Sequence, residues 1–412
     1  MRIRKSMLLL LCVLSLLATA AGCGRSGKGE SSTKAEGGTD IKEADPENLD
    51  DIVMESLVSD VVDQMTLEEK VGQLFIVCTD SLDFNAETSI TDEMKQNIEK
   101  YHPGGIIFFS FNLKDREQIT QYIADIQACS DIPLFISVDE EGGSVARIAN
   151  TEGMGTTKFP SMAVIGKSGD AAKAEELGKT IGREIAGLGF NLDFAPVADI
   201  TTNQGNTEIG ERSFGSDAGL VSDMVSAEVK GLQGQGVSAA LKHFPGQGDS
   251  GEDTHTGYVN LDVTIDRLRD TEFLPFEKGI DAGADFVMMS HVSVSNITQN
   301  EVPASLSSLM VTDILRKELQ YENVIITDAM NMKIITKFYE PAQAALMAVQ
   351  AGNDMVLMPD DFEAAYESIL EAVKDGTLSK SRLNESVSRI IRVKIRRGIL
   401  PLDSPLFEKK SE

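Results

Sequence analysis

The sequence predicts an α/β fold, a TIM-type (β/α)₈ barrel in a single domain. Eight short apolar or β-branched runs occur along the chain, at residues 71–79, 105–109, 134–139, 192–199, 239–245, 286–292, 323–330 and 354–359. Helical patterns lie between them, and strands that are apolar on both faces are typical of a parallel sheet covered by helices. Eight such units predict a sheet that closes on itself.

Two helices and the absence of linkers support this interpretation. Thr66 followed by Glu69 is a capping-box pattern, which marks the start of a helix before Val71. Near the C-terminus one apolar stripe has helical spacing, formed by Leu383, Val387, Ile390, Ile391 and Ile395. No Pro-rich or Ser-rich stretch interrupts residues 51–405, so we assign them to one domain.

The N-terminus predicts export. Basic residues, an apolar run at 7–17 and small residues up to Gly22 form the pattern of a secretory signal over residues 1–22, which is too short to remain as a membrane span. Because Cys23 follows Ala-Ala-Gly, the segment resembles a bacterial lipoprotein signal, with Cys23 as the lipidated residue. Ala20 stands where such signals usually carry Leu, so an ordinary signal peptide is the alternative. We expect a protein outside the cytoplasm, anchored to the membrane by lipid.

Composition indicates a flexible segment, excludes some classes of partner and accounts for the cysteines. Residues 23–50 contain almost nothing apolar and predict a flexible tether. The net charge of −27 becomes about −30 without the three basic residues of the signal, which disfavours nucleic acid and anionic lipid as partners. Cys12 lies in the signal, so Cys78 and Cys129 remain in the domain, where we expect two buried free thiols.

Titratable residues stand at the ends of five predicted strands. They are Asp139, Asp199, the pair Lys242 and His243, His291, and Asp328. Active sites of (β/α)₈ barrels lie at the C-terminal ends of the strands, so these side chains are expected to converge on one rim. A single acidic residue at a strand end can also cap the following helix.

The stretch 242–257 is the most informative part of the chain. It joins a strand end to a glycine-rich loop that contains Asp253 and His255. Their spacing lets the carboxylate orient the imidazole on one side of an extended segment, and such a histidine exchanges protons near neutral pH. An alternative is that His255 only satisfies backbone groups of the loop.

Asp328 follows the apolar run 324–327 and is expected to face the barrel mouth. A carboxylate held by a rigid strand and kept ionised beside Lys242 is suited to nucleophilic attack. The alternative role is an N-cap of the next helix. A further alternative makes His243, Asp249, Asp253, His255 and His291 metal ligands, although their spacing matches neither a zinc nor a magnesium site. We therefore expect no metal and no cofactor.

Seven motifs in order resemble the family 3 glycoside hydrolases, in particular the β-N-acetylglucosaminidase branch. The resemblance covers most of residues 55–400 and rests on residues 65–74, Val138-Asp139-Glu140-Glu141-Gly142-Gly143 with Arg147, residues 191–199, Arg212-Ser213-Phe214-Gly215, residues 242–255, Pro303-Ala304-Ser305-Leu306-Ser307 and Thr327-Asp328.

The resemblance implies a retaining mechanism. Asp328 would form the glycosyl-enzyme, while His255, oriented by Asp253, would protonate the leaving group and then activate water. It also implies that the terminal sugar is held by Asp139, Arg147, Arg212, Lys242 and His243. We expect His291, Asp199 and Met330 to support these residues.

Two comparisons with the family pattern refine this expectation. The β-glucosidase branch takes its acid/base from a second domain, for which this sequence leaves no room, so the Asp253/His255 loop is expected to supply it. Gln247 stands where this branch often has histidine, and we expect altered loop packing or leaving-group preference without loss of activity.

We therefore predict a monomeric exo-β-N-acetylglucosaminidase that acts on cell-wall (muropeptide) or chitin-type oligosaccharides. Two alternatives remain open. A phosphorylase would use phosphate in place of water, because a neutral histidine does not repel it. A lipid-anchored sugar-binding protein would share the signal and tether but would have no turnover.

Overall fold

The computed structural model describes residues 46–251 and 257–407. Residues Asp50–Glu412 form one compact unit, which contains the predicted barrel. Its eight strands are all parallel to their neighbours and close in the order β1-β10-β9-β8-β7-β6-β3-β2. The strands are β1 (Phe75–Cys78), β2 (Gly105–Ile107), β3 (Phe135–Val138), β6 (Leu192–Asp193), β7 (Ser238–Phe244), β8 (Phe286–Met289), β9 (Val324–Ala329) and β10 (Met355–Leu357).

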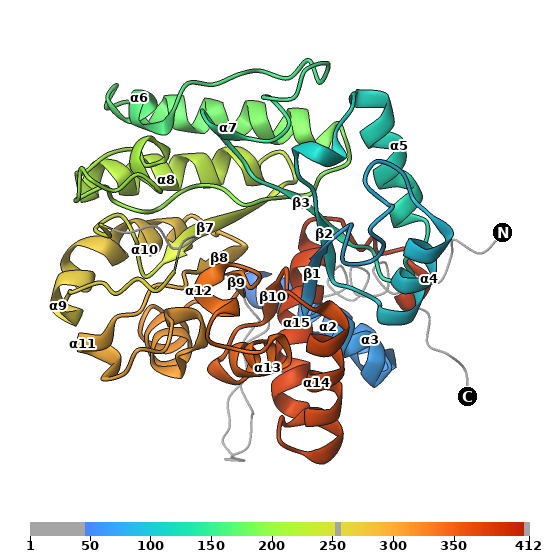
Figure 1. Cartoon of the computed structure of the whole chain (residues 1–412). Coiled ribbons are helices and arrows are strands. Elements are labelled where there is room, and N and C mark those ends of the chain that lie inside the picture. The colour runs from blue at the N-terminus through green and yellow to red at the C-terminus, as the bar shows by residue number, and fades with distance from the viewer. Residues whose placement is uncertain (1–45, 252–256, 408–412) are drawn as a thin grey trace, which may run out of the picture. The chain divides into compact units, whose positions relative to one another are not determined.

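Helices surround the strands (Figure 1). Before the barrel come α2 (Pro46–Gln64) and α3 (Leu67–Gly72), and a short antiparallel hairpin of β4 (Glu140–Gly142) and β5 (Val145–Ala146) follows β3. The other α-helices and π-helical segments are α4 (Asp92–Tyr101), α5 (Arg116–Gln127), α6 (Met162–Gly166), α7 (Ala171–Ala186), α8 (Ala218–Gln233), α9 (Ile265–Arg267), the π-helical segment Leu268–Glu272, α10 (Phe273–Asp281), α11 (Ser295–Thr298), the π-helical segment Leu309–Glu318, α12 (Lys333–Thr336), α13 (Pro341–Ala351), α14 (Phe362–Asp375) and α15 (Lys380–Arg396).

The apolar side chains form two cores because successive strand residues point to opposite faces. Ile76, Phe135 and Phe286 belong to the cluster inside the barrel, whereas Phe75 and Val77 pack between the strands and the helices. Ile390 and Val393 of α15 join the inner cluster. The strands are therefore buried on both faces, as the sequence pattern predicts.

All eight predicted strands exist, but several are shorter than expected. Val71 and Gly72 end α3, so the first strand begins only at Phe75. The run 192–199 forms just the two residues of β6, followed by an isolated bridge between Val197 and Lys242. Pro196 lacks the N–H that a continuous ladder requires, which explains the interruption.

The local predictions also have clear outcomes. The capping box of Thr66 and Glu69 is confirmed, and the stripe that begins at Leu383 and ends at Ile395 is buried on α15. Cys78 and Cys129 are both free, and Cys78 is buried, but the expectation of burial is wrong for Cys129, which is partly exposed because it follows the end of α5. Within the described residues, no helix is both long and apolar enough to cross a membrane.

Candidate active site

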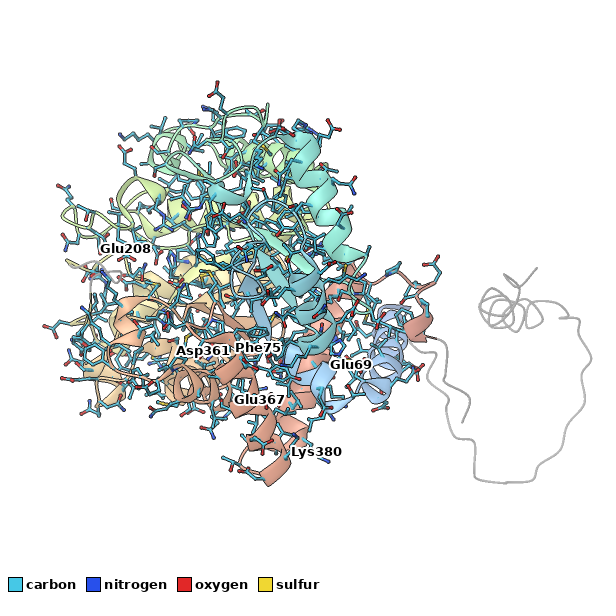
Figure 2. The ribbon with its side chains drawn as sticks, turned by 45° about the vertical axis from the view of Figure 1, so that its right-hand side comes forward. Glu69, Phe75, Glu208, Asp361, Glu367 and Lys380 are labelled. Carbon is cyan, nitrogen blue, oxygen red and sulfur yellow. The ribbon has the colours of Figure 1, made fainter. Side chains whose placement is uncertain are left out.

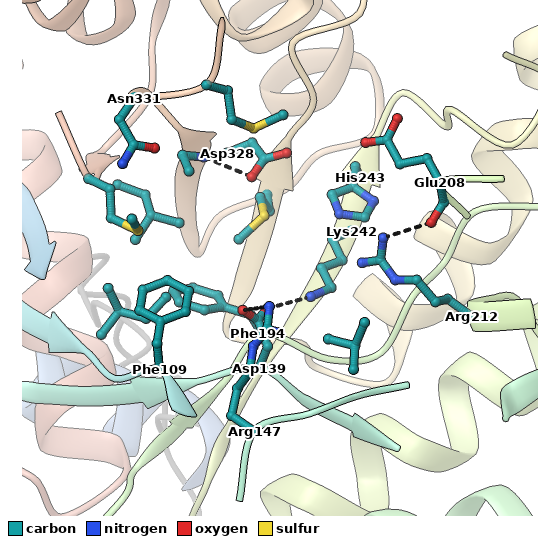
Figure 3. Close-up of a pocket in the computed structure, with 17 residues that line it drawn as sticks. Phe109, Asp139, Arg147, Phe194, Glu208, Arg212, Lys242, His243, Asp328 and Asn331 are labelled. Atoms are coloured by element: carbon teal, nitrogen blue, oxygen red, sulfur yellow. Dashed lines mark hydrogen bonds and ion pairs between the residues drawn. The ribbon is translucent and has the colours of Figure 1, made fainter. Parts of the chain in front are cut away.

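A cavity of about 320 Å³ opens at the C-terminal ends of the strands (Figure 3). Lys242 and His243 of β7 and Asp328 of β9 line it together with residues from the loops after β2, β3 and β6. Figure 2 shows Glu208, another lining residue, well separated from Glu69 of α3 and Lys380 of α15. The strand-end residues Asp139, Lys242, His243 and Asp328 therefore converge as the barrel topology predicts.

Lys242 is the centre of an ion-pair network at the wall of the cavity. Its Nζ lies 2.7 Å from Oδ1 of Asp139 and 2.6 Å from Oε1 of Glu141. Arg212 donates to both oxygens of Glu141, from Nη2 at 2.7 Å and from Nε at 2.9 Å. Because the pairing of Arg212 with Glu141 is bidentate, the guanidinium plane is fixed in direction as well as in place.

These contacts set the protonation of the network. Burial opposes ionisation of Glu141, but Arg212 and Lys242 outweigh it and lower the pKa of this carboxyl to about 2. Burial would also lower the pKa of Lys242, yet Asp139 and Glu141 raise it above the usual lysine value. Glu141 and Lys242 are therefore both charged at neutral pH, and these charges are fixed in place beside the cavity.

The β4–β5 hairpin places Arg147 beside Asp139. Gly142 and Gly143, with φ of 96° and 61°, form its turn, and a side chain at Gly143 would come within 2.9 Å of the Ser161 backbone. The carboxyl of Glu140 accepts the N–H groups of the two residues after Arg147 at 2.7 and 2.9 Å. Arg147 consequently lies with Nη2 3.6 Å from Oδ2 of Asp139.

Asp199 fixes His243 without lining the cavity itself. Its Oδ2 lies 2.7 Å from Nδ1 of His243, and its Oδ1 accepts the N–H of Gln247 at 2.8 Å. Since the carboxylate accepts, Nδ1 of His243 is the donor and Nε2 remains for other contacts. The supporting role of Asp199 in substrate binding stays a prediction.

Gln247 stabilises the loop after β7. Its Oε1 accepts the hydroxyl of Ser290 at 2.7 Å, and its Nε2 lies 3.3 Å from Oε1 of Glu208. The backbone oxygen of Gln247 accepts from Asn206 at 2.8 Å. The side chain thus joins the ends of β7 and β8 to the loop that carries Glu208.

Asp328 stands on β9, and its side chain reaches the cavity. Removal from water opposes its ionisation, but His243, His291 and the N–H of Ala329 lower the pKa of this carboxyl below its usual value. The alternative in which Asp328 caps the next helix is wrong, because α12 begins at Lys333 with Met332 in the cap position. Asp328 is an ionised carboxylate that caps no helix.

His291 and Met330 are buried and do not line the cavity. Nδ1 of His291 contacts the Ser305 hydroxyl at 2.7 Å, and Nε2 lies 3.1 Å from the Ala329 carbonyl oxygen. Burial lowers the pKa of His291, so the ring is neutral at pH 7 and donates one hydrogen bond. His291 therefore contacts Ala329, the strand residue next to Asp328, and its supporting role in catalysis stays a prediction.

Asp253, His255 and Cys23 lie outside the described residues. In the ranges 46–251 and 257–407 no group of three or more His, Cys, Asp or Glu side chains is arranged to hold a metal ion.

Sequence reasoning did not identify Glu141, Glu208, Phe109 or Asn331 as site residues. Glu141 follows Asp139 by two residues, and this alternation at a strand end was the available signal for it. Glu208, Phe109 and Asn331 line the cavity from three different loops. No periodic pattern marks loop residues of this kind, so only the folded chain reveals them.

Comparisons with known proteins agree with this architecture. Residues 66–393 match the model of the glycosyl hydrolase family 3 N terminal domain. Beta-hexosaminidase A of Pseudoalteromonas piscicida is 33% identical over 75% of this chain, which spans 56% of that relative.

Two solved structures share the fold. A family 3 beta-N-acetylglucosaminidase from Paenibacillus sp. has a TM-score of 0.77 and 38% identity, over 81% of this chain and 63% of its own. Beta-N-acetylhexosaminidase from Beutenbergia cavernae has a TM-score of 0.72 and 29% identity, over 80% of this chain and 99% of its own. The motifs, the barrel and these matches together show that this chain belongs to glycoside hydrolase family 3.

Proposed function

We propose that this protein is a retaining exo-β-N-acetylglucosaminidase that hydrolyses terminal β-linked N-acetylglucosamine from cell-wall or chitin-type oligosaccharides. The observation that carries the proposal is an ionised carboxylate, Asp328, in a cavity whose other side holds the charged network of Asp139, Lys242 and Arg212. Relatives that bear the names beta-hexosaminidase and beta-N-acetylglucosaminidase support this substrate class.

In the proposed mechanism Asp328 attacks the anomeric carbon and forms a glycosyl-enzyme as the bond to the leaving oxygen breaks. His255, oriented by Asp253, gives its proton to that oxygen and then accepts a proton from the water that releases the sugar. Asp139, Arg147, Arg212, Lys242 and His243 hold the hydroxyl and acetamido groups by charge-assisted hydrogen bonds. Such bonds fix a neutral sugar in the orientation that attack requires.

The nucleophile is tested with an aryl β-N-acetylglucosaminide and the corresponding β-glucoside. Wild type should release sugar from the first and much less from the second, with the β-anomer formed first by NMR. Asp328→Asn should lower kcat by on the order of 10³-fold or more. Asp403→Asn, at an exposed position near the C-terminus, is the control and should keep full activity.

The same assay in phosphate buffer separates hydrolysis from phosphorolysis. The proposal predicts free N-acetylglucosamine with and without phosphate, whereas sugar 1-phosphate would identify a phosphorylase. Sugar binding by wild type with no turnover would instead identify a binding protein. An Asp328→Asn variant with the wild-type rate would refute the assignment of the nucleophile.

A further inference from the structure

A second cavity of about 520 Å³ adjoins the first. Phe109, Asn331 and Met358 line both, so the two spaces share one boundary. Asn331 lies three residues after Asp328, and Figure 3 shows it and Phe109 on the opposite side of the first cavity from Arg212 and Glu208. The second cavity therefore begins on the side of the reaction centre away from Arg212 and Glu208. Arg147, which pairs with Asp139, lies at the shared boundary, with its guanidinium carbon 5.6 Å from the centre of the Phe109 ring.

Two exposed aromatic rings line this second cavity. Phe84 is 80% exposed and Phe111 is 49% exposed, so both rings are accessible to a ligand in this cavity. Phe111 stacks on Phe109 with ring centroids 5.9 Å apart and planes 9° from parallel. Flat rings held in this way present a face that the C–H groups of a sugar ring can cover, with release of water from both surfaces.

The polar side chains of the second cavity favour an uncharged ligand with donors. Asp80 and Asp360 are exposed carboxylates on its lining, and none of the described residues that line it is Lys, Arg or His. Carboxylates accept hydrogen bonds from hydroxyl and amide N–H groups, and they repel another carboxylate. The sugar of a chitin-type chain offers these donors, whereas a muramyl sugar brings a lactyl carboxylate.

We propose that the second cavity binds the leaving-group sugar and selects a neutral N-acetylglucosamine residue, so that the preferred substrates are chitin-type oligosaccharides and not muropeptides. This inference rests on the proposed function, because it requires the terminal sugar to react at Asp328. The reducing-end sugar then crosses the boundary formed by Phe109, Asn331 and Met358. Phe84 and Phe111 supply the stacking surface, and Asp80 and Asp360 supply the acceptors.

The aromatic part is tested with Phe84→Ala, Phe111→Ala and the double variant. Chitotriose is compared with β-N-acetylglucosaminyl azide, whose leaving group is too small to reach the second cavity. Each single variant should raise KM for chitotriose by about three- to tenfold and should leave KM for the azide unchanged. Phe338→Ala is the matched control, because it removes another phenyl ring that is 60% exposed. It should leave KM unchanged for both substrates.

The outcomes distinguish the two proposals. If wild type hydrolyses neither the azide nor an aryl β-N-acetylglucosaminide, the proposed function fails. If the azide is hydrolysed but the Phe84 and Phe111 variants keep the wild-type KM for chitotriose, only the second-cavity inference fails. An equal rise in KM with Phe338→Ala would also overturn the inference, because the effect would not belong to this cavity.

Charge selection is tested by comparing kcat/KM for chitobiose with that for the disaccharide N-acetylglucosaminyl-N-acetylmuramic acid. Wild type should have the higher kcat/KM for chitobiose. The double variant Asp80→Asn/Asp360→Asn should reduce the ratio of the two kcat/KM values. High salt should reduce it as well, since exposed charges are screened. A wild-type preference for the muramic acid disaccharide would refute the inference.

Discussion

Glu141 does not line the cavity, but it forms ion pairs with two residues that do. Its partners are Arg212, from the segment between β6 and α8, and Lys242 of β7. A carboxylate buried between two cations compensates charges that would otherwise be costly to remove from water. The directions in which Arg212 and Lys242 point therefore depend on Glu141.

We expect Glu141→Gln to weaken substrate binding and folding together. The amide leaves two buried cations poorly compensated, which should cost roughly 3–5 kcal/mol of unfolding free energy. Misplacement of Arg212 and Lys242 should lower kcat/KM for an aryl β-N-acetylglucosaminide by about 100-fold. Urea unfolding and steady-state kinetics measure the two effects, with exposed Glu152→Gln as the control.

The pH dependence of this effect has a defined sign. The pKa of Glu141 is lowered to about 2 in the folded state, so its stabilisation is complete above its unfolded pKa. That contribution, roughly 3 kcal/mol, is lost as the pH falls from about 4.5 to 2. The stability difference between wild type and Glu141→Gln should shrink over this range, and a constant difference would contradict the assignment.

At the scale of elements, α15 connects the end of the chain to the inside of the barrel. Lys394 lies fully buried on this helix, with Nζ 2.6 Å from Oε1 of Gln73 and 5.1 Å from the centre of the Phe135 ring. Burial lowers the pKa of this amine to about 7. The apolar stripe of α15 was evident in the sequence, but a lysine one residue before Ile395 gave no sign that it points inward.

Lys394 should make stability rise with pH. Its folded pKa is below its unfolded value, so the unfolded chain binds the extra proton, and stability present above about pH 10 is lost as the pH falls toward 7. In wild type the free energy of unfolding should increase between pH 7 and 10, and we expect Lys394→Met to reduce this increase by roughly 3 kcal/mol. Chemical denaturation at several pH values measures this, and exposed Lys380→Met on the same helix should leave the increase intact.

At the scale of the whole molecule, we expect folding of the barrel to require its last helix, α15. Five buried apolar side chains of the α15 stripe each contribute roughly 1.5–3 kcal/mol, which together matches the whole stability of a typical domain. A chain that ends at residue 379 should therefore fail to fold, whereas one that ends at residue 402 should remain folded. Circular dichroism and limited proteolysis compare the two, and a folded, soluble 1–379 chain would contradict this role of α15.

We propose further that the mature protein is attached to the membrane through Cys23, outside the cytoplasm. Cys23→Ala should abolish labelling by a radioactive fatty acid and move the protein to the aqueous phase of a detergent partition. Enzymatic activity should remain, since the residues that line the cavity all lie between Ile107 and Met358. Unchanged labelling of the variant would refute lipidation at Cys23.

The sequence by itself determined the family, the eight strands and the convergence of Asp139, Lys242, His243 and Asp328. The family follows from the order of the motifs, and the strands follow from local apolar runs. Because all strands of a closed parallel barrel end at the same rim, polar residues at their C-terminal ends converge there. Strand ends were less well predicted, as at Pro196, where backbone hydrogen bonding decides.

Only the tertiary structure decided which residues share a space. Glu141 joins Arg212 to Lys242, His291 supports Ala329 without entering the cavity, and the second cavity gathers side chains that follow β1, β2, β9 and β10. These residues are far apart in the chain, and barrel closure through the pairing of β1 with β10 brings their loops together. A sequence pattern records which face of an element is apolar, whereas the meeting of distant loops depends on the packing of the whole barrel.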